Sequence, residues 1–144
     1  MKTVFSKLVP FLGTVALSWT LVASLPAETL PSSVQEKIEI FFQQLQKGEI
    51  QPAFEKMIQG SLIGRNTAQI QNLVNQFNNA VSLYGSVTGS DCVKTNMVGD
   101  SLCRTVCLSK NENHPLKWTF VFYKGTADWT LINIEFDDNI ELLF

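Results

Sequence analysis

The feature that most constrains the fold is a change of hydrophobic period at Tyr84-Gly85. Before this point, apolar residues recur every three or four positions, a spacing that places them along one side of a helix. After it, apolar and polar residues alternate, as in strands with one buried face. Helices followed by strands predict an α+β domain, with three N-terminal helices packed on one face of a curved four-stranded antiparallel meander.

Two helices are expected before the connector at residues 61–65. The first should begin near Val34, because Ser33 and Glu36 have the spacing of a capping box, and it should end at Gly48. The second is shorter and covers residues 52–58. Its proline lies in the first turn, where a missing backbone N–H is tolerated.

The third predicted helix follows Asn66 or Thr67, either of which can cap it, and runs to Tyr84. Its apolar stripe faces the core. Its other face carries amides and no charge: Gln69, Gln71, Asn72, Asn75, Gln76, Asn78 and Asn79. Such a face could hydrogen-bond a partner or a glycan, or it could simply be solvated.

The alternating half contains four predicted strands joined by turns rich in Asn, Asp, Gly and Pro. The strands cover 87–98, 102–110, 116–124 and 129–136. Loops of two, five and three residues would pair Val98 with Ser101, Lys110 with Leu116, and Lys124 with Asp128. This register gathers one apolar set on the face toward the helices: Val93, Met97, Leu102, Val106, Leu108, Trp118, Phe120, Phe122, Ile132 and Ile134.

The first 27 residues differ from the rest of the chain. They start with Lys2 and Lys7, continue with a mostly apolar stretch over 8–25, and contain no acidic residue. This is the layout of a secretory signal peptide, with cleavage after Ala27 or Ser24. The alternative is an uncleaved membrane anchor, for which 18 residues is close to the lower limit. Residues 28–144 are then a single secreted or periplasmic domain.

Composition excludes several classes of function. Removing residues 1–27 leaves nine basic and 13 acidic residues, so no basic patch indicates a nucleic-acid partner. A single histidine, His114, rules out a histidine-rich metal site. The run Asp137-Asp138-Asn139 offers too few oxygens for a calcium shell. No metal site and no cofactor are expected.

The same register places Cys92 opposite Cys107, on the sheet face away from the helices. An exported chain meets oxidising conditions, so these two cysteines are predicted to form a disulfide. A bond between Cys103 and Cys107 is excluded, because four residues along one strand separate the two Cα atoms by about 13 Å.

That outer face also has more apolar residues than a solvated sheet requires. The predicted patch consists of Cys103, Val121, Tyr123, Trp129 and Leu131. One interpretation is a self-association surface, on which a homodimer would bring Cys103 near its counterpart. The other is that the C-terminal residues 140–144 fold over it.

The order of elements resembles the nuclear transport factor 2-like (cystatin-like α+β) superfamily over about residues 32–144. The resemblance rests also on the aromatic stretch Leu116-Lys117-Trp118-Thr119-Phe120-Val121-Phe122-Tyr123-Lys124 and on Asp128-Trp129. Small exported bacterial members of unassigned function have a similar layout. The resemblance implies a cone-like domain that encloses a pocket between helices and sheet, and in many members a dimer formed through the sheet. It carries over no catalytic motif.

The polar residues aimed at such a pocket would be Tyr84, Asp91 and Arg104, accompanied by Thr95 and Thr130. We expect the first three to be its ligand-binding groups. The predicted function is an exported, non-catalytic domain that binds a small apolar or amphipathic ligand or another protein. The alternatives are a lyase- or isomerase-type enzyme using the same pocket, and an accessory domain tethered to the membrane by its N-terminus.

Overall fold

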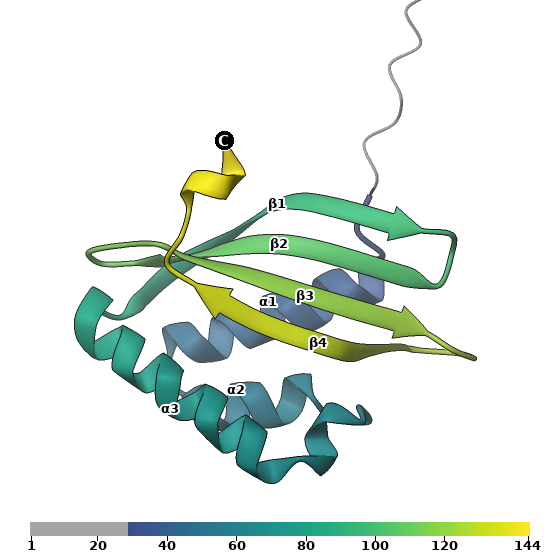
Figure 1. Ribbon diagram of the computed structural model, residues 1–144, viewed down its shortest axis with the longest axis horizontal. Coiled ribbons are helices and arrows are strands. Elements are labelled where there is room, and N and C mark those ends of the chain that lie inside the picture. Colours follow the sequence, from purple (N-terminus) through teal and green to yellow (C-terminus); the bar gives the residue numbers. More distant parts are fainter. Residues whose placement is uncertain (1–28) are drawn as a thin grey trace, which may run out of the picture.

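The computed structural model describes residues 29–144, and the expected signal peptide or anchor lies outside the described residues. Helices and strands follow the order predicted: α1 (Ser32–Gln46), α2 (Ile50–Met57), η1 (Ile63–Arg65), α3 (Thr67–Tyr84), β1 (Val87–Val98), β2 (Leu102–Asn111), β3 (Leu116–Lys124), β4 (Trp129–Asp137) and η2 (Glu141–Leu143). The strands form one antiparallel sheet in the order β1-β2-β3-β4, which confirms the α+β class. Figure 1 shows α1, α2 and α3 on one side of the sheet and η2 on the other. No helix in the described part of the chain is long and apolar enough to cross a membrane.

Backbone groups, rather than the predicted capping box, start α1. The carbonyl of Pro31 accepts hydrogen bonds from the N–H groups of Val34 and Gln35, both at 2.9 Å, and no side chain caps the helix. For α3 the cap is Asn66, as predicted, and its Oδ1 accepts from the Gln69 N–H at 3.1 Å.

The core is an aromatic cluster centred on Trp118, which is fully buried. Its ring lies 4.8 to 6.2 Å, between centroids, from the rings of Phe41, Phe42, Phe54, Phe77, Phe120 and Phe136. Three of these six pairs, those with Phe41, Phe42 and Phe77, meet edge to face, a favourable geometry for aromatic rings. The space between helices and sheet, where the resemblance implied a pocket, is therefore filled by side chains.

The β1–β2 pairing differs from the predicted register at its turn. Val98 pairs with Leu102 instead of Ser101, because the loop contains three residues instead of two. A bulge at Val93 then shifts the register by one, so that Cys92 lies opposite Cys107 as predicted. The predicted pairing at the cysteines is correct because the bulge compensates for the longer loop.

The β2–β3 pairing is displaced by one residue along its whole length. Ser109 pairs with Leu116, and Cys107 lies opposite Trp118. The loop is held by the preceding connection, since the N–H groups of Glu112 and Asn113 donate to the carbonyls of Ser86 and Tyr84. The face of β2 that meets the helices consequently carries Cys103, Thr105, Cys107 and Ser109, each of them fully buried.

The β3–β4 pairing also contains a bulge. Lys124 pairs with Trp129 across a four-residue turn, and the register shifts again beside Ile132. Five of the ten residues expected on the helix side are therefore elsewhere, at bulges or on the outer face: Val93, Leu102, Val106, Leu108 and Ile132. The other five, Met97, Trp118, Phe120, Phe122 and Ile134, are placed as predicted.

Cys92 and Cys107 form a disulfide, as predicted, across 15 residues of sequence. The prediction that this bond lies on the face away from the helices is wrong. Cys107 is completely buried and belongs to the main core. Its displacement to the inner face follows from the one-residue shift between β2 and β3.

The residues of the predicted self-association patch do not lie on one surface. Cys103, Trp129 and Leu131 are 0, 7 and 2 % exposed and lie in the core, because the loop lengths reverse their faces. Only Val121 and Tyr123 remain on the outer face. Part of that face is covered by η2: Leu143 lines an outer-face hollow together with Val106 and Thr119. The alternative expectation placed residues 140–144 over the predicted patch, whereas Leu143 borders Val106 and Thr119, which do not belong to that patch.

Candidate functional site

The three predicted ligand-binding residues do not meet in one place. Asp91 pairs with the outer-face residue Leu108, and its Oδ2 forms an ion pair with the Lys110 Nζ at 2.6 Å, with both side chains about half exposed. It also borders a hollow of about 370 Å³ at the sheet edge, together with Ile38 and Phe42 of α1. Arg104 is exposed on the same outer face, in the hollow beside Leu143. The predicted β2–β3 register was wrong by one residue, and both side chains were therefore assigned to the inner face instead of the outer one. The expectation that they line an interior pocket is therefore wrong.

Tyr84, the third predicted residue, joins the end of α3 to the segment after β4. Its hydroxyl donates to the Asp138 Oδ2 at 2.6 Å, and its ring lies 5.1 Å from the ring of His114. This hydrogen bond, with smaller effects of burial and of the aspartate charge, raises the pKa of Tyr84. The same hydrogen bond, assisted by backbone donation and by the charge of His114, lowers the pKa of Asp138. The hydrogen bond and the ring contact join the end of α3, the β2–β3 loop and the segment after β4 at the surface.

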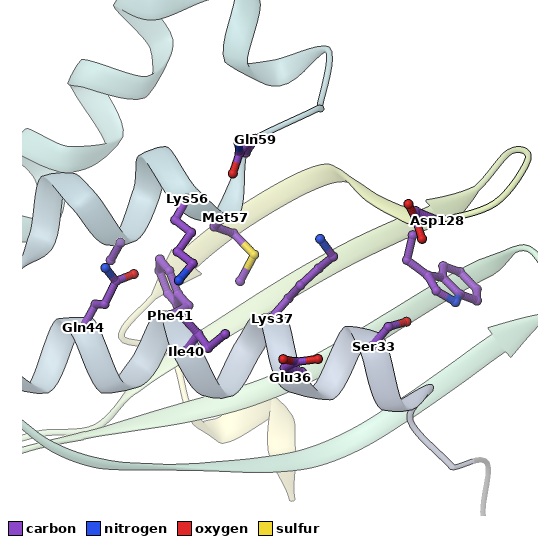
Figure 2. A pocket seen from close by; sticks show the side chains of 12 residues that line it. Ser33, Glu36, Lys37, Ile40, Phe41, Gln44, Lys56, Met57, Gln59 and Asp128 are labelled. Carbon is purple, nitrogen blue, oxygen red and sulfur yellow. The ribbon is translucent and has the colours of Figure 1, made fainter.

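A groove between α1, α2 and the start of β4 is the candidate ligand site. Its volume is about 350 Å³, at the lower end of the range for small-molecule sites. Figure 2 shows the helices α1 and α2 as its two sides, with Asp128 at one end. It is lined by Ser33, Glu36, Lys37, Ile40, Phe41, Gln44, Ala53, Lys56, Met57, Gln59, Asp128 and Trp129.

The floor of this groove is apolar. Phe41, Ala53, Met57 and Trp129 are each at most 7 % exposed, so they present apolar surface at the base and keep the rest of their atoms in the core. These residues come from α1, α2 and β4, so the packing of three elements shapes the floor. A rigid apolar base of this kind can accept the hydrocarbon part of a small molecule.

The rim carries charges of both signs. Lys37 extends from α1 and Lys56 from α2 into the space between the helices (Figure 2). Glu36 and Asp128 also line the groove, which balances its formal charge. Over residues 29–144 the ion pairs are Asp91–Lys110 and Lys117–Asp137, and neither involves a groove residue. The two ammonium groups are therefore available to a ligand.

One acceptor in the groove lacks a donor. The Gln44 Oε1 is buried from solvent and has no hydrogen-bond partner within the described residues. A buried polar atom left without a partner costs about 1–3 kcal/mol. Although Gln44 lines the groove, this oxygen is closed even to a molecule the size of water, so a ligand donor cannot reach it in this conformation and the unmet acceptor reflects how the side chain packs.

Sequence reasoning treated α1 and α2 only as covers for the sheet and missed this site. One sequence pattern could have indicated the groove. Along α1, four of its lining residues recur at intervals of three or four positions: Ser33, Lys37, Ile40 and Gln44. Residues at such intervals share one side of a helix. This stripe mixes apolar, amide and charged residues, unlike the purely apolar stripe that faces the core.

The amide face of α3 contributes to a second hollow of about 460 Å³, with Gln69, Asn72 and Gln76 facing the β4 residues Ile132 and Asn133. In this hollow, no described side-chain atom is both buried and without a hydrogen-bond partner. The hollow differs from the α1–α2 groove in its lining, which contains amide and apolar side chains and no charged one.

Comparisons with family models, with curated proteins and with solved structures find no match for this chain. The likeness to the nuclear transport factor 2-like superfamily thus rests on the order and pairing of the elements, and it stays a prediction.

Proposed function

We propose that the protein is an exported, non-catalytic binding domain, and that the groove between α1 and α2 holds a small amphipathic ligand. The observation that carries the proposal is a groove of about 350 Å³ with an apolar floor, bordered by lysines of α1 and α2 that have no ion-pair partner among the described residues. The groove combines a few polar groups with a larger apolar surface, the usual make-up of small-molecule sites.

Binding, rather than catalysis, is favoured by the place of the polar groups. The enzyme alternative requires a base and a hydrogen-bond donor together in a dry pocket. Asp91 and Arg104 lie on the outer sheet face and Tyr84 at the end of α3, while the interior is filled by aromatic rings. The rim charges of the groove are open to solvent, which suits recognition of a charged ligand.

Export is supported by the Cys92–Cys107 disulfide, because such bonds persist in oxidising compartments. The signal-like composition of residues 1–27 agrees with the same destination.

The binding proposal is tested by adding small amphipathic compounds to the ¹⁵N-labelled protein and following amide resonances. We expect the resonances of Lys37, Gln44 and Lys56 and the indole resonance of Trp129 to move together. The variant Ile40→Trp, which fills the half-buried wall of the groove, should weaken binding at least tenfold.

The matched control is Leu83→Trp, which adds the same ring to α3 at a side chain 67 % exposed and outside the groove. It should bind as the unmodified protein does. The proposal is contradicted if Ile40→Trp binds equally well, or if the shifts gather at Gln69 and Gln76 instead.

A further inference from the structure

We propose that a second copy of this chain packs on the exposed side of α3 that carries Gln69, Asn72 and Gln76, in an interface with two-fold symmetry. This surface is separate from the α1–α2 groove, which no residue of α3 lines. Three features carry the proposal: a projecting leucine, a hollow on the same side of the helix, and a surface without charge.

The leucine and the hollow occupy opposite ends of one side of α3. Leu83 is 67 % exposed near the end of the helix. It follows Gln76 by seven residues, which is close to two helical turns, so the two side chains share a side. Gln76 and Gln69 line the hollow of about 460 Å³ beside the first half of α3, together with the apolar side chains of Leu73 and Ile132.

A two-fold axis at Gln76 makes these features complementary. Two α3 helices packed antiparallel about that residue place each Leu83 opposite Gln69 of the other copy, because both residues lie seven positions from the axis. Gln69 borders the hollow, so each leucine can enter the hollow of the other copy. Leu83 and Ile132, which is 47 % exposed, then leave water together, and this favours association in proportion to the apolar area buried.

The lack of charge on this side of α3 favours a copy of the same chain as the occupant. Residues close to a two-fold axis meet their own counterparts, so a charged residue there would face a like charge. No charged residue occurs between Arg65 and Asp91, although the whole chain has a formal net charge of −2. A primary amide has both donor and acceptor atoms, so Gln76 can form a hydrogen bond with Gln76 of the second copy.

Sedimentation equilibrium of the protein after export measures the association. We expect the average mass to rise from that of one chain toward that of two as the protein concentration increases. Leu83→Glu should weaken the association about tenfold or more, because it would bring a carboxylate into the apolar part of the hollow. The matched control is Val98→Glu, the same kind of change at a side chain 65 % exposed at the end of β1, and it should associate as the unmodified protein does.

Single cysteines on α3 test the symmetry under mild oxidation. Gln76→Cys should give a covalent dimer, because the two copies of residue 76 meet at the axis. Gln69→Cys should give little, because its two copies would lie about 21 Å apart along antiparallel helices. Asn78→Cys should also give little, since this exposed position lies two residues beyond Gln76 and therefore on nearly the opposite side of α3.

Three results would overturn the proposal. The first is the mass of a single chain at every concentration tested. The second is a loss of association in Val98→Glu equal to or larger than the loss in Leu83→Glu, which would place the interface on the sheet. The third is a covalent dimer of Gln69→Cys in higher yield than that of Gln76→Cys. Ligand binding in the α1–α2 groove is measured separately, so each of these results leaves the proposed function intact.

Discussion

Two hydroxyl groups of β2 lie inside the aromatic core, and both are hydrogen-bonded. The Ser109 hydroxyl accepts from the Trp118 Nε1–H at 3.0 Å and donates to the Asn111 Oδ1 at 2.9 Å. The Thr105 hydroxyl donates to the Lys94 carbonyl at 3.1 Å. A buried indole N–H needs such an acceptor, because an unmade hydrogen bond in the core costs about 1–3 kcal/mol. The large central tryptophan thus requires polar residues on the inner face of the neighbouring strand.

At the same scale, the Tyr84–Asp138 hydrogen bond predicts an altered titration. The bond raises the pKa of Tyr84 above its ordinary value of 10.0 and lowers that of Asp138 below 3.8. In a Tyr123→Phe background, Tyr84 alone gives the phenolate absorbance near 295 nm. We expect Asp138→Asn to move that titration to lower pH, because the carboxylate that favours the protonated phenol is removed.

The signs of the two shifts set the pH dependence of the contact. The lowered pKa of Asp138 means that its contribution to stability is present above pH 3.8 and is lost as the pH falls through the folded value. The raised pKa of Tyr84 means that its contribution is present below pH 10.0 and is lost as the pH rises through the folded value.

For the titration of Tyr84, Asp100→Asn, in an exposed turn, is the control and should leave the Tyr84 titration unchanged. An unchanged titration in Asp138→Asn would refute the assignment.

At the scale of elements, the β1–β2 hairpin is held by the disulfide. The bond closes a loop of 15 residues, for which chain-entropy estimates give about 3 kcal/mol of stabilisation. We expect Cys92→Ala/Cys107→Ala to lower the free energy of unfolding by about that amount, measured by urea denaturation followed through tryptophan fluorescence. The unmodified protein in reducing agent should show a similar loss, and an unchanged urea midpoint in both samples would contradict the prediction.

The strands were predictable from the sequence, whereas the faces of their residues were not. Alternation and turn residues placed all four strands to within one residue at each end. The pairing depends on loop length and on bulges, and each added residue reverses which face a side chain occupies. The bulges at Val93 and beside Ile132, together with the hydrogen bonds that hold Glu112 and Asn113, arise from tertiary contacts.

The groove was not predicted for a related reason. Each of its helices was expected, but the approach of Lys37, Gln44 and Lys56 depends on how α1 packs against α2. The packing is set by Phe41 and Phe54, whose rings meet at 5.3 Å in the core. A sequence pattern shows which side of a helix is unusual, but it does not show which other helix faces that side.

At the scale of the whole molecule, a short C-terminal turn lies over part of the sheet face opposite the helices. The helices cover one face of the sheet, and η2 covers part of the other (Figure 1). Beneath η2, Val106 and Thr119 are 8 and 4 % exposed, although they lie on the outer face. The C-terminal segment therefore protects apolar surface that a two-layer sandwich would leave in water.

The position of Leu143 beside Val106 and Thr119 predicts that this leucine contributes to the stability of the fold. Leu143→Ala should lower the free energy of unfolding by about 1 kcal/mol, because a partly buried side chain on Val106 and Thr119 is removed. Urea denaturation is the measurement. The adjacent variant Phe144→Ala should have no effect, since that side chain is fully exposed. Equal losses in both variants would contradict a specific role for Leu143.

The position of the disulfide beside the Val93 bulge has a consequence for how the chain matures. A hairpin with a bulge can pair in frames that differ by one residue, and a slip of one would exchange Cys107 for Leu108 at the core face. Only the native frame brings the two sulfur atoms together. Formation of the Cys92–Cys107 bond would therefore retain the hairpins that have paired in the native frame, and it would leave the mispaired ones free to open again.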